Sequence, residues 1–295
     1  MPWQLILSIQ IVIGYIVSSI LLKKLADLPQ KNRRIAWQFF FCALFSIIFV
    51  TFKITTGSTF HLSWLVLVAA GLGIFNALAN YFYWRAMNIS LSKTSLFGRY
   101  DDLMAMALGF IFLGEIKFLN PGLLIGISVC LGASFLFITQ KSRTKDKHES
   151  NITLFKWLLM TNLIWGTTIF FMRYFAVNGL PMPEYLFGWY GGSFLGAWLL
   201  VRIDKKEMSN GKFSIKEIRD VAILSATLWA TMLLNYWAMQ LAPLTVLSPI
   251  NFISRIIFPM LVGFLIFKET TALTRLEKFA FLLGLVGAVT IGLSF

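Results

Sequence analysis

The chain has 295 residues, of which 58% are hydrophobic and only 13% are charged, and its mean hydropathy is +0.75. Soluble globular domains usually carry about 25% charged residues, so this composition excludes an ordinary soluble protein and predicts an integral membrane protein. The net charge of +13 does not indicate nucleic-acid binding, because the basic residues lie in short segments between apolar runs and not on one polar face.

Apolar runs long enough to cross a membrane recur along the whole chain. A helix needs about 20 mostly apolar residues to cross roughly 30 Å of hydrocarbon. Ten segments meet this rule, at 3–22, 35–52, 62–84, 92–114, 119–139, 154–177, 184–202, 217–240, 244–267 and 276–294. No A-x-A-like cleavage site follows the first segment, so we expect a span there and not a removed signal peptide. The sequence therefore predicts an all-α, multi-pass protein of the cell (inner or plasma) membrane with ten transmembrane helices.

The predicted spans form two similar halves. The only long polar stretch between them, 141–151, reads as a solvated linker between a first five-helix repeat at 1–140 and a second at 152–295. At one constant offset, Gln10 and Gly14 lie opposite Asn162 and Gly166. Because five is an odd number, the second copy must enter the membrane upside down relative to the first. This inverted repeat is the architecture of many secondary transporters.

The distribution of basic residues predicts an orientation. Most of the 26 Lys and Arg residues lie in or beside the loops that follow the odd-numbered spans, whereas the loops on the opposite side contain only Lys53 and Lys117. Lys and Arg are retained preferentially on the cytoplasmic side of short loops. The charge pattern therefore predicts that both termini face away from the cytoplasm.

Several short motifs are similar to those of a known transporter family. They are Trp165-Gly166 early in the second half, the Tyr-Trp-Ala-Met stretch at 236–239, Ala242-Pro243 after it, and Gly114-Glu115 at the end of span four. With these motifs the chain resembles the EamA-like branch of the drug/metabolite transporter superfamily. The resemblance implies a ten-span small-molecule transporter, favours export, and implies that both termini face the cytoplasm. The first half departs from the pattern, with Ile13-Gly14 where the second half has the tryptophan-glycine pair.

Charged residues within the spans are the first candidates for a substrate site. Such groups are costly in a membrane and tend to face the bundle interior or a wet cavity. Span four contains Arg99, Asp101 and Asp102, and span nine contains Arg255 at the depth that the repeat makes equivalent to Asp101. Arg99 and Asp102 are three residues apart and can form a charge or gating pair on one helix face. The pattern predicts that Asp101 binds an ammonium group and Arg255 a carboxylate of a zwitterion, with an Asp101–Arg255 salt bridge or gate as the alternative.

Polar and aromatic residues near these charges complete the predicted substrate-binding set. They share helix faces with one another or occupy matching repeat positions, and they are Asn251, Asn80, Tyr83, Asn162, Trp165 and Gln10. The alternative for Gln10 and Asn162 is interhelical hydrogen bonding. Cys42 and Cys130 lie within apolar runs, where a thiol usually behaves as a small apolar group.

No pattern for catalysis, ATP or metal binding was found in the sequence. It lacks a Walker-type loop, G-x-S-x-G and H-E-x-x-H, so we expect no enzyme activity, no cofactor and no metal site. We expect alternating access that moves small polar metabolites, with amino acids or similar zwitterions preferred. Protons are a candidate coupling ion, the bilayer is the surrounding partner, and the chain acts as a monomer or a homodimer. The alternatives are organic cations or quaternary amines, nucleotide-type anions, an intramembrane enzyme acting on lipid, and a cation channel.

Overall fold

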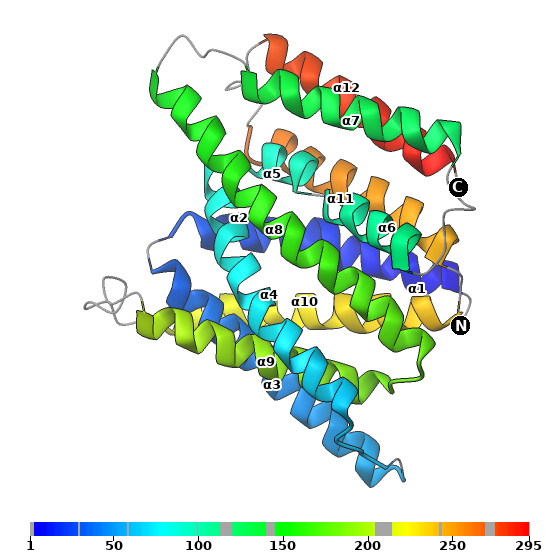
Figure 1. The fold of residues 1–295 in the computed structure, drawn as a ribbon. Helices are drawn as coiled ribbons and strands as arrows, with labels where there is room; N and C mark the ends of the chain where they lie inside the picture. Colours follow the sequence, from blue (N-terminus) through cyan, green and yellow to red (C-terminus); the bar gives the residue numbers. More distant parts are fainter. Residues whose placement is uncertain are drawn as a thin grey trace. The chain divides into compact units, whose positions relative to one another are not determined.

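The computed structural model describes residues 3–28, 30–57, 59–98, 100–112, 120–139, 145–203, 214–241, 244–268 and 275–294. In chain order the helices are α1 (Trp3–Ile11), a π-helical segment (Val12–Val17), α2 (Ser18–Ala26), α3 (Lys31–Thr55), α4 (Trp64–Ile89), α5 (Leu91–Phe97), α6 (Tyr100–Phe112), α7 (Pro121–Thr139), α8 (Lys145–Val177), α9 (Met182–Ile203), α10 (Ile215–Leu241), α11 (Leu244–Leu265) and α12 (Arg275–Leu293) (Figure 1). These ranges contain no β-strand, so the described part of the chain is all-α.

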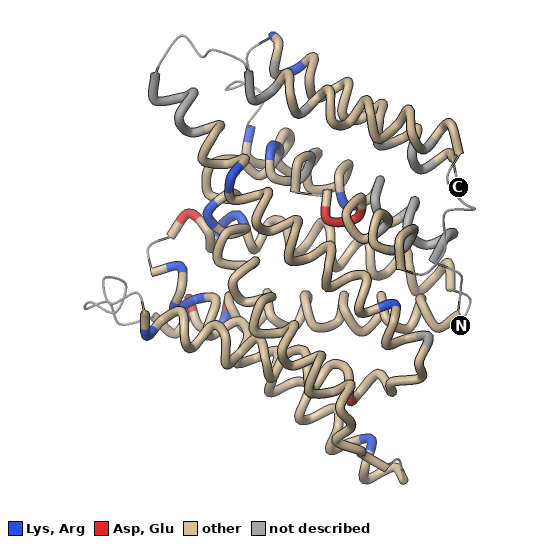
Figure 2. The backbone as a smooth tube through the Cα atoms, in the orientation of Figure 1, with Lys and Arg blue, Asp and Glu red and all other residues tan. Residues whose placement is uncertain are grey.

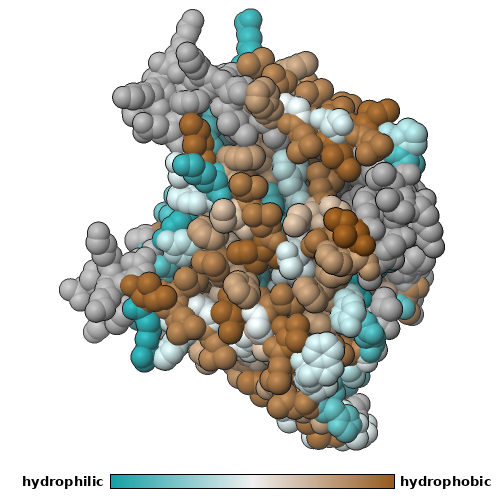
Figure 3. Space-filling model, in the orientation of Figure 1, coloured by the Kyte–Doolittle hydropathy of each residue, from teal (hydrophilic) through white to brown (hydrophobic). Residues whose placement is uncertain are grey.

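Five helical segments of the described chain are long and apolar enough to cross a membrane. They are Trp3–Ala26, Lys31–Thr55, Trp64–Ile89, Asn151–Ala176 and Ile215–Leu241. Many of their outward side chains are apolar, and brown predominates among the described residues of the face drawn in Figure 3. Charged residues gather toward helix ends, with long uncharged stretches between them (Figure 2). An apolar surface of this extent is favourable in lipid and costly in water, so the chain has the character of a membrane-embedded helical protein.

The chain forms two compact units, each of which takes segments from both predicted repeats. Unit 1 comprises Met1–Trp84 and Phe171–Leu241, and unit 2 comprises Arg85–Phe170 and Ala242–Phe295. Helices α4 and α8 therefore each contribute to both units. Helix α8 begins at Lys145, so the end of the predicted linker is helical.

Unit 1 is built around close packing between long helices. Helix α3 packs against α9 and α10, and α1 packs against α10. A Cβ added at Gly188 would lie 2.7 Å from the Val66 carbonyl oxygen, and one at Gly196 would lie 2.6 Å from that of Ile74. Small residues thus let α9 approach the backbone of α4 directly, which is a common way of joining helices in lipid.

Unit 2 contains two packed helix pairs, α7 with α12 and α5 with α11. A Cβ added at Gly287 would lie 2.9 Å from the Gly126 carbonyl oxygen, so α7 and α12 also approach closely through glycine. The thiol of Cys130 is buried in this seam and donates to the Gly284 carbonyl oxygen at 3.7 Å. Cys130 is a free cysteine that packs like a small apolar side chain.

The structure corrects the prediction of one continuous helix over 92–114. Helix α5 starts after Ser90, whose Oγ accepts from the Lys93 backbone N–H at 3.2 Å, and it ends at Phe97. The Gly98 N–H donates to the Thr94 carbonyl oxygen at 2.8 Å, and a new helix starts at Tyr100. A Cβ added at Gly98 would lie 2.4 Å from the Thr94 carbonyl oxygen, so glycine suits this position. The break lies directly before the two aspartates predicted to carry function.

Candidate functional site

A group of three charges, of which Asp101 is buried and Asp102 and Arg255 are mostly buried, lies within unit 2. Arg255 on α11 places Nη1 3.6 Å from Asp102 Oδ1 and 3.9 Å from Asp101 Oδ2. The side chains of Asp101, Asp102 and Arg255 are 2%, 14% and 16% exposed. One guanidinium thus faces two adjacent carboxylates, and we refer to these three residues as the charge centre. The charge centre carries a formal charge of −1 when all three groups are ionised.

The break in the predicted fourth span determines where the two carboxylates lie. Asp101 and Asp102 are in the first turn of α6, where acidic side chains are favoured by the positive end of the helix dipole. Asp101 Oδ1 accepts from the Asp102 backbone N–H at 3.0 Å. That bond satisfies one of the four N–H groups left without an intrahelical partner at a helix start. The other oxygen, Oδ2, is the one nearest Arg255.

The geometry matches the predicted alternative of an Asp101–Arg255 salt bridge and gives Asp102 a partner that was not predicted for it. Asp101 and Arg255, predicted at equivalent depth, lie within ion-pair distance in unit 2. Asp102 was predicted to pair with Arg99, and Arg99 lies outside the described residues, so the structure does not test that pair. The described partner of Asp102 is Arg255.

Two polar side chains extend the charge centre along α11. Asn251 precedes Arg255 by four residues and therefore lies on the same helix face. Asn251 and Ser254 are both buried. The amide of Asn251 is therefore buried one turn before the guanidinium of Arg255 on α11.

Asn162 lies at the helix break in unit 2, where its side chain forms a hydrogen bond with a backbone carbonyl. Its Nδ2 donates to the carbonyl oxygen of Phe97, the last residue of α5, at 2.9 Å. Asn162 is 6% exposed. Trp165 follows on the same helix and is half-buried. Asn162 therefore has the interhelical hydrogen bond that was the alternative to substrate binding, here to a backbone carbonyl.

The remaining predicted residues belong to unit 1 and are held in side-chain networks. Gln10 is buried on α1, and its Nε2 donates to the Tyr15 hydroxyl at 2.9 Å and to Asn235 Oδ1 at 3.3 Å. Asn80 is buried on α4 and donates to the Oδ1 of Asn76 at 3.0 Å. Tyr83 is buried on α4, three residues further along. Gln10 thus has the interhelical bond given above as its alternative.

The sequence interpretation missed several polar partners. Asn76 donates from Nδ2 to Ser193 Oγ at 2.9 Å and thereby joins α4 to α9. Lys93 is buried on α5, with Nζ 3.1 Å from Asn151 Oδ1 on α8. Lys93 stands at the edge of an apolar run, which is the usual place of a topology-setting lysine. Its burial could be recognised only from the packing of α8 against it.

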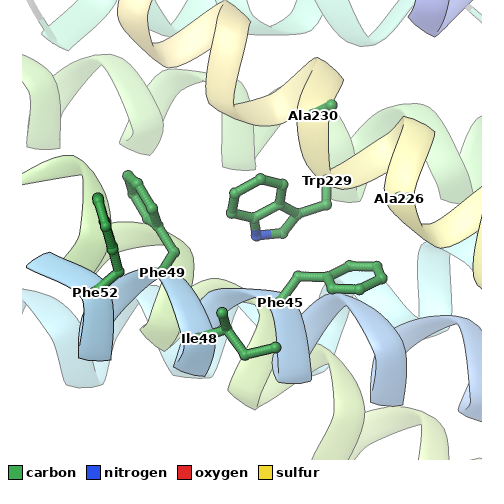
Figure 4. A pocket seen from close by; sticks show the side chains of 7 residues that line it. All are labelled: Phe45, Ile48, Phe49, Phe52, Ala226, Trp229 and Ala230. Carbon is green, nitrogen blue, oxygen red and sulfur yellow. The ribbon is translucent and has the colours of Figure 1, made fainter.

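A separate apolar groove lies in unit 1 between α3 and α10 (Figure 4). Its volume is about 490 Å³, and it is lined by Phe45, Ile48, Phe49, Phe52, Ala226, Trp229 and Ala230. The Trp229 indole N–H donates to Ser46 Oγ at 3.0 Å, so the one polar atom of the ring is already engaged. Figure 4 shows aromatic rings on both sides of the groove. The lining suits hydrocarbon and offers no charged group to a zwitterion.

Within the described residues, no group of three His, Cys, Asp or Glu side chains is arranged to hold a metal ion. Asp101 and Asp102 are adjacent carboxylates, and the cation they face is the guanidinium of Arg255. The charge centre thus contains one guanidinium and two carboxylates, groups that can form ion pairs with charges of either sign.

Comparison with known proteins identifies a structural neighbour and no family. A solved structure described only as "Crystal structure of protein" matches this chain with a TM-score of 0.64 and 16% sequence identity. The match covers 99% of this chain and 97% of the neighbour, so the two share a fold over nearly their whole length. No family model matches the sequence, and no curated protein matches it.

Proposed function

We propose that this chain is a secondary transporter that moves small polar metabolites across the cell membrane, with amino acids or similar zwitterions as preferred substrates. The observation that carries the proposal is the charge centre of Asp101, Asp102 and Arg255, buried within apolar helices at a helix break. Intramembrane charges are expensive and usually mark substrate or ion pathways. Transporter sites are commonly built where a membrane helix is interrupted.

The proposed architecture is ten spans arranged as two inverted five-helix repeats. Helices at equivalent places in the two repeats pack in pairs, α3 with α9, α5 with α11 and α7 with α12. Pairing of equivalent helices is expected when two copies are related by a pseudo-two-fold axis. The resemblance to EamA-like members of the drug/metabolite transporter superfamily agrees with this arrangement and favours export.

The charge centre suits a zwitterion because it contains both signs within one small volume. A substrate carboxylate can take the Arg255 guanidinium, while a substrate ammonium takes the carboxylates of Asp101 and Asp102. The guanidinium and the carboxylates then each face an opposite charge of the substrate in place of one another, so neither side is left without a counter-charge during binding. Leaving one member of a buried pair alone costs about 3–5 kcal/mol, and this exchange avoids that cost.

The same pairing offers a link between substrate binding and helix position. Arg255 lies against both aspartates, which ties α11 to the first turn of α6. With substrate inserted, this direct link is replaced by a link through the solute. Because α5 and α6 are separate helices, α6 can change position without bending a continuous helix. Such a link between ligand binding and helix position is what alternating access requires.

The test is uptake by proteoliposomes that contain the full chain, with amino acids, quaternary amines and nucleotide sugars as separate radiolabelled solutes. We expect uptake of at least one zwitterion above that of protein-free vesicles, and much weaker uptake of solutes that carry one sign of charge. Uptake confined to quaternary amines or to nucleotide sugars would refute the zwitterion proposal. Movement of none of these solutes would refute transport of this class.

A further inference from the structure

One face of α8 contacts the end of α5 at the helix break. Leu158, Asn162 and Gly166 follow one another at four-residue steps and therefore share this face. A Cβ added at Gly98 would lie 3.4 Å from Leu158 Cδ2, so the first of them packs beside the break. One turn later, Asn162 Nδ2 donates to the Phe97 carbonyl oxygen at 2.9 Å. Carbonyl groups in the last turn of a helix lack an intrahelical donor, and the amide supplies one.

The next turn of the same face contacts the start of α6. A Cβ added at Gly166 would lie 2.5 Å from Met104 Cβ and 2.8 Å from the Asp101 carbonyl oxygen. Only glycine permits this approach, because both atoms are held close to the α6 backbone and cannot swing away as a side-chain tip can. Consecutive turns of α8 thus contact both sides of the break, and the second contact is to an aspartate of the charge centre.

The equivalent pair in the other repeat has the same spacing and a different partner. Gln10 and Gly14 of unit 1 both contact α10, Gln10 through Asn235 and Gly14 beside Thr231. Helix α10 runs uninterrupted from Ile215 to Leu241. A polar residue followed by glycine one turn later therefore joins helices in both units, but only in unit 2 does it join a broken one.

We propose that Asn162 and Gly166 are positioning residues for the charge centre. Asn162 fixes the end of α5, Gly166 fixes the first turn of α6, and together they hold Asp101 and Asp102 in front of Arg255. This assignment rests on the proposed function for its role in transport, while the positioning itself is a property of the folded chain. Asn162 acts through the aspartates and does not bind the substrate.

A double-mutant cycle on the full chain in detergent tests the positioning without any transport measurement. The variants are Asn162→Leu, Arg255→Gln and the two combined. Leucine keeps the approximate shape of asparagine and removes the hydrogen-bond donor. The thermal unfolding midpoint is measured for each variant. Residues that act through one network are not additive. We expect the combined shift to fall short of the sum of the single shifts by about 2–4 °C, the range produced by modest coupling. The cycle of Gln10→Leu with Arg255→Gln is the matched control and should be additive.

Additivity of Asn162→Leu with Arg255→Gln would overturn the proposal, and so would equal non-additivity in the Gln10 cycle. If Asn162→Leu yields no folded protein, the cycle of Gly166→Ala with Arg255→Gln decides by the same criterion. Gly132→Ala is its neutral control, because a Cβ at Gly132 meets nothing within 4 Å.

Transport kinetics separate positioning from a merely structural role. Asn162→Leu and Gly166→Ala should raise the KM for a transported zwitterion several-fold at equal amounts of folded protein. Asn162→Gln should restore most of the affinity, because it retains an amide donor like that of Gln10. An unchanged KM in both variants, or no recovery with Asn162→Gln, would refute positioning for substrate binding. If wild-type chain moves no zwitterion, the proposed function fails while the unfolding cycle still decides the positioning.

Discussion

Replacing Arg255 by glutamine removes the guanidinium that faces Asp101 and Asp102. Taking one partner from a buried ion pair typically costs about 3–5 kcal/mol. The nitrogen–oxygen distances of 3.6 and 3.9 Å exceed the 2.7–2.9 Å of a direct charge-assisted hydrogen bond, so we expect the lower end, about 3 kcal/mol. At about 2–4 °C per kcal/mol, the thermal midpoint should fall by roughly 6–12 °C.

The assay is thermal unfolding of the purified full chain in detergent, followed by intrinsic fluorescence, with two comparison variants. Arg219→Gln breaks an exposed pair with Asp220 at 3.6 Å, where the side chains are 66% and 35% exposed, and should cost less than about 1 kcal/mol. Converting Asp101, Asp102 and Arg255 together to Asn, Asn and Gln removes every charge of the centre and should recover most of the loss. The reasoning is refuted if Arg255→Gln costs no more than Arg219→Gln, or if the triple variant is as unstable as Arg255→Gln alone.

Two further predictions concern packing within the units. Cys42 and Cys130 are buried, and their thiols donate to backbone carbonyls. A maleimide should therefore leave the folded chain unlabelled and modify two thiols after denaturation. Labelling before unfolding would contradict the packing. Gly196→Ala places a Cβ 2.6 Å from the Ile74 carbonyl oxygen and should destabilise the folded chain by about 1–3 kcal/mol. Gly191→Ala is the control, because its Cβ meets nothing within 4 Å. Equal thermal unfolding midpoints for the two variants would argue against the close packing of α4 and α9.

The helical membrane character of the chain followed from composition because it depends on the sum over many residues. Runs of about 20 apolar residues exclude most other folds whatever their detailed packing. The exact course of span four could not be predicted, because hydrophobic periodicity alone does not detect so short an interruption between α5 and α6. Gly98 followed by Asp101 and Asp102 contains the local signal, since glycine is common after a helix and acidic residues are common in a first turn.

The charge centre was the part of the candidate site that sequence comparison within the chain predicted best. Matching the two repeats placed Asp101 and Arg255 at one depth, and the structure places them 3.9 Å apart. The same matching placed Gln10 opposite Asn162 but could not reveal what each would bind. Asn162 donates to the carbonyl oxygen of Phe97, and a backbone acceptor cannot be recognised from the types of side chain in the sequence.

The polar residues of unit 1 illustrate a second limit of prediction from the sequence. Asn76 and Asn80 are four residues apart on α4, and Asn80 Nδ2 lies 3.0 Å from Asn76 Oδ1. Their connection to Ser193 on α9 could not be predicted, because it depends on the glycine contacts that bring α4 and α9 together. Helical spacing identifies neighbours within a helix, whereas partners between helices depend on packing.

Counterflow of a zwitterion in proteoliposomes tests the central claim most directly, since it reports exchange of substrate through the site and requires no coupling ion. Vesicles loaded with unlabelled solute should accumulate the labelled zwitterion transiently with wild-type chain and with the surface variant Asp220→Asn. Asp101→Asn and Arg255→Gln, compared at equal amounts of folded protein, should each abolish or strongly reduce that accumulation. If both buried-charge variants exchange the zwitterion as fast as Asp220→Asn does, the charge centre is not the substrate site.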